Sequence, residues 1–203
     1  MAKSPPRQIG RPKRSDADVA QTRKEIAAVA LRLFHAEGCN SVSIRRLAQE
    51  AGCSPMTIYA HFDGKIDILQ YLWADVLDQL FEQIEAEIAS LTSEVARLSA
   101  AAQTFLRFWI EAPEHFRLVF MSDGVERSDV GCFLNRAETK AQFQRFAELV
   151  AAAVPAGADA TQRFDSLLAA LIGAAMAHNT LTDYPWIAAD KMADDYVDLA
   201  IRP

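Results

Sequence analysis

The sequence has few cysteines and no long hydrophobic run. Its three cysteines, Cys39, Cys53 and Cys132, are an odd number and include no CxxC pair, which argues against a disulfide framework or a zinc site. The longest apolar stretch, 167–177, is far shorter than the ~20 residues of a membrane-spanning helix. The basic first residues lack the apolar segment of a secretory signal. We therefore expect a cytoplasmic protein that has no cofactor, no metal and no membrane partner.

Motifs that would indicate catalysis are also missing. The sequence contains no GxSxG, no glycine-rich phosphate loop, no HExxH and no clustered Cys/His or carboxylate set. We therefore do not expect an enzyme. Glycine and proline are sparse, at eight residues each, and 51% of the residues are hydrophobic. Together with the absence of an alternating strand pattern, this composition predicts an all-α fold.

Charge is distributed unevenly along the chain. The net charge is −6, but residues 1–65 hold 11 Lys and Arg against 6 Asp and Glu, whereas residues 66–203 hold 10 against 21. A basic segment is attracted to nucleic-acid phosphates and an acidic one is repelled by them. The first third is therefore the candidate for contact with DNA. The acidic remainder is better suited to packing, dimerisation or binding another molecule.

The stretch 43–62 has the pattern of two short helices around a tight turn. Ser54 can cap the second helix, and Pro55 suits the first helical position, where no N–H partner is required. A short helix with an apolar back and a polar, aromatic front is typical of a helix-turn-helix, whose second helix lies in the DNA major groove. The face of the first helix is formed by apolar residues at i, i+3, i+4 and i+7: Ile44, Leu47, Ala48 and Ala51.

Apolar residues at helical spacing predict further helices over most of the chain. We expect them at 22–37, 65–90, 94–111, 114–121, 127–153, 159–181 and 185–201. The predicted organisation is a flexible basic arm at 1–15, a three-helix domain at 16–65 and a helical bundle at 66–203. The basic residues at 10–14 either enter the minor groove or form a solvated tail.

Residues 22–72 resemble the DNA-binding domain of TetR-family transcriptional regulators. The resemblance rests on I-A-A-V-A-L-R-L-F-H-A-E-G from Ile26 and on A-G-x-S-x-x-T-I-Y-x-H-F-x-x-K, which ends at Lys65. The stretch W-I-E-A-P-E-H-F-R-L-V-F, 109–120, is similar to part of one group of the family's ligand-binding domains. The resemblance implies a homodimer that joins through its last two helices and places two recognition helices on a partly palindromic operator.

The positions that match the motif define the expected contacts with double-stranded DNA. By this resemblance Tyr59 and Lys65 suit phosphates, while Arg45 suits a guanine edge. A solvated helix face is the alternative for Arg45 and Arg46, and simple helix packing is the alternative for Met56. The complete expected set is Ser43, Arg45, Arg46, Ser54, Pro55, Met56, Thr57, Tyr59, Ala60, His61 and Lys65.

The acidic part is rich in aromatic residues and methionine, which line pockets for apolar ligands but also fill ordinary cores. We expect a small-molecule effector to contact Trp73, Phe105, Trp109, Phe116, Phe120, Met121, Phe143, Met176, His178 and Asn179. Together with the resemblance, this predicts a repressor that an apolar or aromatic molecule releases from its operator. The alternative is a DNA-binding regulator without a ligand.

One apolar stripe in the helix expected at 159–181 suits a dimer seam, although the chain's own core could equally cover it. The stripe is formed by Leu167, Leu171, Ala174, Ala175 and His178. Small residues beside it would let two backbones approach closely. They are Ala169, Ala170, Gly173 and Ala177.

Overall fold

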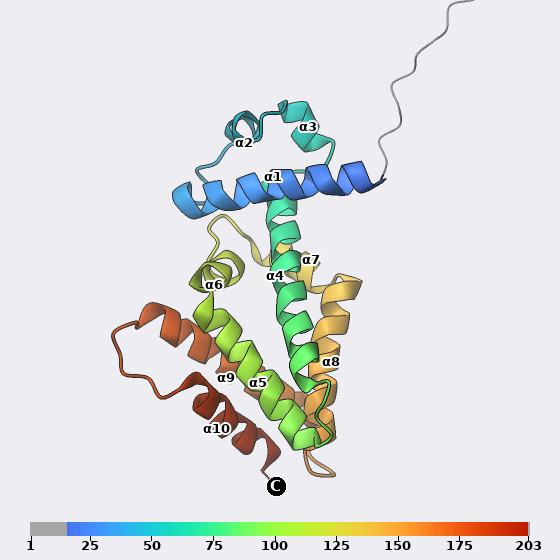
Figure 1. Cartoon of the computed structure of the whole chain (residues 1–203), viewed down its shortest axis with the longest axis vertical. Helices are drawn as coiled ribbons and strands as arrows, with labels where there is room; N and C mark the ends of the chain where they lie inside the picture. The colour runs from blue at the N-terminus through green and yellow to red at the C-terminus, as the bar shows by residue number, and fades with distance from the viewer. Residues whose placement is uncertain (1–15, 203) are drawn as a thin grey trace, which may run out of the picture.

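The computed structural model describes residues 16–202, and all regular secondary structure in that range is helical (Figure 1). The predicted all-α fold is therefore confirmed, while the predicted arm at 1–15 lies outside the described residues. No helix within 16–202 has the length and apolarity to cross a membrane. The helices are α1 (Asp16–Glu37), α2 (Ile44–Glu50), α3 (Pro55–Tyr59), α4 (Lys65–Ile88), α5 (Glu94–Glu111), α6 (Pro113–Phe120), α7 (Arg127–Leu134), α8 (Ala137–Ala153), α9 (Ala160–Thr180) and α10 (Ala189–Ile201).

The first three helices form a small module at one end of the molecule, where α1 lies across the start of α4 (Figure 1). Local signals set its short helices. The Ser43 hydroxyl accepts a hydrogen bond from the Arg46 N–H at 3.1 Å, and the Ser54 hydroxyl accepts one from the Thr57 N–H at 3.1 Å. Each serine thus satisfies an N–H group that a helix start leaves unpaired. Gly38 ends α1 with φ of +79°, a conformation that favours glycine.

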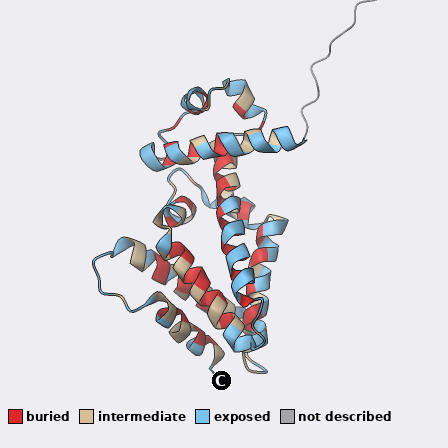
Figure 2. Cartoon of the chain, viewed as in Figure 1, coloured by how far each residue is buried: buried red, intermediate tan, exposed pale blue. Residues whose placement is uncertain are grey.

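The core of this module contains the residues that carry the predicted apolar faces. Phe34, Leu47, Ile58 and Phe62 are all at most 7% exposed. The buried side of α1 continues into the buried N-terminal end of α4 (Figure 2). Burying a large apolar side chain contributes about 1.5–3 kcal/mol, so this shared core holds α2 and α3 at a fixed orientation to α4.

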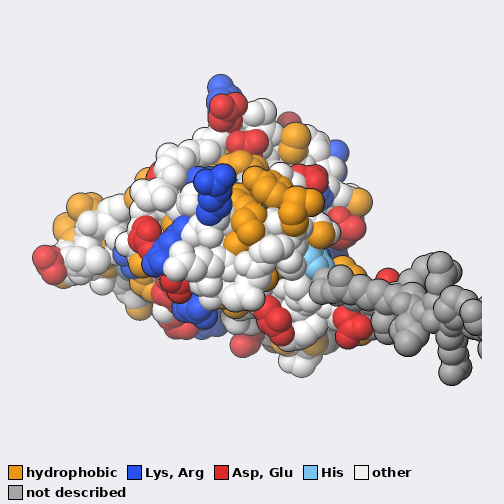
Figure 3. Space-filling view, turned by 90° about the horizontal axis from the view of Figure 1, so that it is seen from above, with side chains coloured by type: hydrophobic (Ala, Val, Ile, Leu, Met, Phe, Trp, Pro, Cys, Tyr) orange, Lys and Arg blue, Asp and Glu red, His pale blue; other side chains and the backbone are white. Residues whose placement is uncertain are grey.

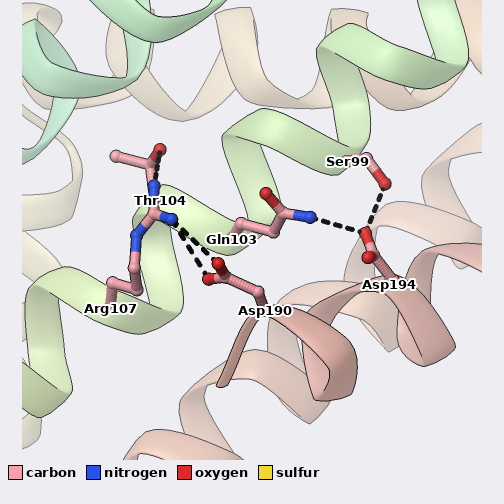
Figure 4. Close-up of polar contacts among 6 residues, drawn as sticks. All are labelled: Ser99, Gln103, Thr104, Arg107, Asp190 and Asp194. Atoms are coloured by element: carbon pink, nitrogen blue, oxygen red, sulfur yellow. Dashed lines mark hydrogen bonds and ion pairs between the residues drawn. The ribbon is translucent and has the colours of Figure 1, made fainter. Parts of the chain in front are cut away.

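In the C-terminal bundle α5 is the central helix and packs against α4, α6, α8, α9 and α10. Its buried side carries Phe105 and Trp109, each 1% exposed. The opposite side holds α10 through polar contacts (Figure 4). There the Arg107 guanidinium lies 3.0 Å from the Asp190 carboxylate, and the Asp194 carboxylate accepts hydrogen bonds from Ser99 at 2.7 Å and from Gln103 at 2.8 Å. One helix therefore connects the interior of the bundle to its last helix.

The prediction that the apolar stripe of α9 forms the dimer seam was wrong for four of its five residues. Leu167, Leu171, Ala174 and Ala175 are at most 6% exposed within the single chain. They are covered because α9 packs on α5, α6, α8 and α10. The monomer's own core is thus the partner of this stripe. The fifth residue, His178, is half-buried and stacks on Trp186 with ring centroids 5.1 Å apart.

The helix predicted at 127–153 is two helices, α7 and α8. The break falls at Asn135 and Arg136, where the Arg136 backbone is extended, with φ of −63° and ψ of 144°. The Asn135 side chain donates to the Gly131 carbonyl at 2.8 Å and so competes with continued helix. The Arg136 guanidinium donates to the Gln70 side-chain oxygen at 2.7 Å, which fixes the break against α4. This tertiary contact carries no local sequence signal.

Candidate functional site

The exposed face of α2 and α3 is the first candidate site. Figure 3 looks onto this end of the molecule, where hydrophobic side chains gather beside Lys and Arg side chains. Met56 is 75% exposed and Tyr59 is 52% exposed, so α3 presents a protruding apolar and aromatic surface. Arg45 is exposed and forms no ion pair with any described residue. Pro55 and Ala60 are exposed on the same short helix and its cap. These groups are free to meet a partner.

Other members of the predicted DNA-contacting set are engaged within the protein. Arg46 lies 2.8 Å from the Glu50 carboxylate and 3.8 Å from that of Glu37. The Lys65 ammonium donates to the Cys39 carbonyl at 2.8 Å and to the Asn40 carbonyl at 3.2 Å. Its positive charge therefore supports the turn after α1. Two of the three N–H groups of this ammonium are thus used within the chain, and the expectation that Lys65 also contacts a phosphate stays a prediction.

The remaining members differ in accessibility. Ser43 and Ser54 cap their helices, and the Thr57 hydroxyl lies 2.9 Å from that of Ser54. These side chains order the recognition helix while they stay near its surface. His61, expected on the DNA side, is 7% exposed. Because Ile58 and His61 are three residues apart, His61 falls on the buried side of the segment, so we leave it out of the contact surface.

Sequence reasoning missed Arg23 in α1. Its guanidinium lies 4.3 Å from the centre of the Phe62 ring and 5.3 Å from that of Tyr71. It also donates to the His61 carbonyl at 2.7 Å. Arg23 thereby joins α1, the end of α3 and α4. An arginine in an expected helix with no charged neighbour at helical spacing gives no signal of such a contact.

The second candidate site is an apolar cavity of about 450 Å³ in the C-terminal bundle. This volume lies within the ~300–1,000 Å³ that is usual for small-molecule sites. Five of the ten predicted ligand residues line it: Trp73, Phe105, Trp109, Phe120 and Phe143. Further lining residues that the sequence did not single out include Phe133, Lys140, Phe164, Leu168 and Ile172. Phe164, Leu168 and Ile172 share one face of α9, but spacing alone cannot tell that this face borders a cavity.

The other five predicted ligand residues do not line this cavity. Phe116 is fully buried in the core. Met121 borders a separate hollow between the end of α1 and α6, and Met176 is 45% exposed on α9. The Asn179 amide donates to the carbonyls of Trp109 at 3.0 Å and Ala175 at 2.9 Å, so it is a structural group. His178 stacks on Trp186.

A loop after α6 connects this cavity to the N-terminal module. The Asp123 carboxylate accepts hydrogen bonds from the backbone N–H groups of Cys39 at 2.8 Å and Asn40 at 3.3 Å. These are in the same turn that Lys65 supports. Burial is the largest cause that raises the pKa of the Cys39 thiol, with Lys65 lowering it and Asp123 raising it. Gly124 has φ of +71°, and a Cβ there would lie 2.0 Å from the Asn40 side-chain oxygen. The close approach of loop and turn therefore depends on glycine.

Comparison with known proteins bears on both sites. The family model described as bacterial regulatory proteins, tetR family, matches residues 26–72, which contain α2, α3 and the start of α4. Over residues 26–72 the chain is thus similar to the TetR family. Curated TetR-like relatives are described as transcriptional regulators, which agrees with the expectation that this protein is not an enzyme.

Two curated relatives and one solved structure illustrate the extent of the likeness. The chain is 30% identical to the regulator HbdR of Aromatoleum sp. (strain CIB) over 60% of this chain and 53% of HbdR. It is 24% identical to the activator FasR of Mycolicibacterium smegmatis over 54% of this chain and 50% of FasR. The match thus spans about half the length of these relatives. The regulator FadR of Bacillus subtilis, solved with stearoyl-CoA, shares the fold with a TM-score of 0.71 and 14% identity, over 88% of this chain and 97% of FadR.

Among residues 16–202, no group of three or more His, Cys, Asp or Glu side chains is placed to hold a metal ion. The two candidate sites are the protruding helix α3 and the apolar cavity of the C-terminal bundle.

Proposed function

We propose that the protein is a homodimeric transcriptional regulator that binds a partly palindromic operator and releases it when a largely apolar small molecule enters the cavity. The observation that carries the proposal is the exposed α3, with Met56 and Tyr59 protruding, in the segment that matches the family model. A recognition helix in the major groove with its companion helix against the backbone is the docking geometry of a helix-turn-helix. Arg45, Thr57 and Tyr59 are the proposed polar contacts.

The apolar side chains on this helix bear on how the operator is read. Pro55, Met56 and Ala60 offer no side-chain hydrogen bond, so they can touch a thymine methyl but cannot pair with a base edge. Arg45 is the unpaired cation best placed for a bidentate contact with guanine, whereas Arg46 is already paired with two carboxylates. We therefore propose that base readout depends mainly on Arg45 and Thr57, with Tyr59 on a phosphate.

The cavity supports the ligand part of the proposal. It is enclosed by helices α4 to α9 and almost entirely apolar, and Phe120, Val130 and Leu134 line it while at least 36% exposed. These three residues mark where a ligand can enter. FadR of Bacillus subtilis, a structural neighbour, was solved with stearoyl-CoA, which has a long apolar chain. This agrees with an apolar ligand here.

The route from cavity to DNA is proposed through α6 and α4 together. The Trp73 indole of α4 lines the cavity and donates to the Leu118 carbonyl of α6 at 2.7 Å. The same carbonyl accepts a hydrogen bond of 2.6 Å from the hydroxyl of Ser122, the residue that precedes Asp123. A ligand that displaces Trp73 or α6 therefore shifts the loop that holds the turn after α1. In a dimer this changes the separation of the two recognition helices, which must match a half-site spacing of ~34–36 Å.

The dimer is proposed through the outer faces of α9 and α10, consistent with the usual arrangement in the family. On α9 the exposed face carries Ala169 and Gly173, which are small enough to permit close helix packing, and Met176, which is 45% exposed. On α10 Leu199 is 52% exposed, and the α9–α10 loop adds Tyr184 at 58%. We propose that these exposed apolar residues meet their counterparts on a second copy. This face replaces the buried stripe that the sequence suggested.

The test is fluorescence anisotropy with labelled DNA from the region upstream of the protein's own gene, because regulators of this family often control a neighbouring gene. We expect saturable binding that 1-decanol reverses. Repression, as distinct from the activation for which FasR is described, predicts higher transcription from that promoter when the gene is deleted. DNA binding that no apolar compound alters would instead favour a regulator without a ligand.

A further inference from the structure

The lining of the bundle cavity is uniform in chemistry except at one position. Thirteen of its residues are apolar or aromatic, and Lys140, on the first turns of α8, is the one that carries a charge. Lys140 lines the cavity and is also exposed, so this residue lies where the cavity meets solvent. Its neighbours on the lining, Leu134 and Phe143, are both apolar. A single cation therefore borders an otherwise apolar volume.

Lys140 has no partner within the described part of the chain. Other surface cations, such as Arg97, Arg145 and Lys191, lie within ion-pair distance of a carboxylate, but no described carboxylate lies that close to Lys140. A long lysine side chain that already had an ion pair would gain little from a second anion. Lys140, which has no such pair, is available to bind an anionic group of a ligand.

A second, independent feature is a buried donor without an acceptor. Trp109 lines the cavity and is 1% exposed, yet its indole N–H has no hydrogen-bond partner among the described residues. The Trp73 indole, by contrast, is satisfied by the Leu118 carbonyl. Among the lining side chains Lys140 is therefore the one charged donor, and none of them is a carboxylate or an amide.

From this complementarity we propose that the effector is an amphipathic anion, with an apolar body inside the cavity and a negatively charged group beside Lys140. The proposal rests on the ligand response argued above and adds the charge of the ligand. The anionic group is either the carboxylate of a free acid or the phosphates of an acyl thioester carrier. Neutral hydrocarbons and cationic drugs cannot pair with the charge of Lys140.

The test compares decanoate, 1-decanol and decanoyl-CoA by isothermal titration calorimetry on the full chain. Lys140→Met removes the charge but keeps an apolar side chain, and Lys140→Arg keeps the charge. Lys24→Met, an exposed lysine in α1 remote from the cavity, is the matched control. We expect Lys140→Met to weaken binding of at least one anionic probe about tenfold, which corresponds to ~1.4 kcal/mol. Lys140→Arg and Lys24→Met keep wild-type affinity, and 1-decanol binds all four proteins alike.

The three probes distinguish the possible results. Loss confined to decanoate indicates a free acid, and loss confined to decanoyl-CoA indicates an acyl thioester; both support the proposal. Equal binding of the anionic probes to wild type and Lys140→Met overturns it, and if 1-decanol still releases DNA the proposed function stands. If none of the three probes binds the wild type, the ligand part of the proposed function fails together with this inference.

Discussion

At the scale of single residues, exposure separates groups that meet a partner from groups that hold the fold. Tyr59 is 52% exposed and caps no helix, so Tyr59→Ala should weaken operator binding about tenfold or more while the melting temperature stays close to wild type. Fluorescence anisotropy and thermal denaturation measure the two quantities. Gln144→Ala, at an exposed position of α8 in the C-terminal bundle, serves as a control. Wild-type affinity in Tyr59→Ala would remove Tyr59 from the contact surface.

His178 gives a prediction for pH. Burial lowers the pKa of its imidazole from the usual 6.5. The unfolded chain therefore takes up this proton more readily than the folded one, so stability is lost as the pH falls through 6.5. His178→Phe keeps an aromatic ring against Trp186 but cannot be protonated. Its melting temperature should fall less than that of wild type between pH ~7.5 and ~5.5. Parallel pH profiles of the two proteins would contradict this.

At the scale of elements, the loop after α6 is expected to transmit the ligand signal. Asp123→Ala removes both hydrogen bonds to the turn after α1. We predict that operator affinity without ligand changes little, whereas the factor by which ligand weakens it falls severalfold, because coupling needs a physical connection between the sites. The operator dissociation constant, measured with and without 1-decanol, gives this factor. Asp183→Ala, in the exposed α9–α10 loop, is the control. An unchanged factor in Asp123→Ala would assign the coupling to α4 alone.

The elements also show which parts of the fold the sequence could predict. Helix starts at Ser43 and Ser54 and the stop at Gly38 were predictable because capping and left-handed turns depend on a few adjacent residues. The break at Asn135 was not, because Arg136 reaches α4 for its partner. The contact between Asp123 and Cys39 joins residues 84 positions apart, and nothing local indicates it.

The candidate sites follow the same division. Among the residues expected to contact DNA, the exposure of Met56 and Tyr59 follows from a short motif, whereas His61 is buried and Lys65 donates to the turn after α1 through tertiary contacts. For the cavity, five of the ten predicted ligand residues are among those that line it. Aromatic side chains at helical spacing fill a core and line a pocket equally well, and only packing decides which of Phe116 and Phe120 borders the empty volume. The inward direction of Leu167 and Leu171 was undecidable for the same reason.

At the scale of the whole molecule, the proposed function requires a second copy of the chain. Gly173 lies on the exposed face of α9, and apart from the adjoining backbone of α9 no atom of residues 16–202 lies within 4 Å of the position its Cβ would take. Gly173→Arg should therefore leave the monomer fold intact, place a charge in the proposed dimer face and shift the mass in solution toward one chain. Thr161→Arg, exposed at the start of the same helix, is the control. If both variants sediment as dimers, the dimer interface does not include Gly173.

The central claim is that ligand and operator compete through the shape of the dimer. Binding linkage requires that operator weaken the ligand by the same factor by which the ligand weakens the operator. The most direct measurement is calorimetry of whichever probe binds best among decanoate, 1-decanol and decanoyl-CoA, with the protein free and with the protein saturated by operator DNA. We predict a weaker ligand affinity on DNA, by the factor seen in the reverse titration. Equal affinities in the two titrations would contradict the account.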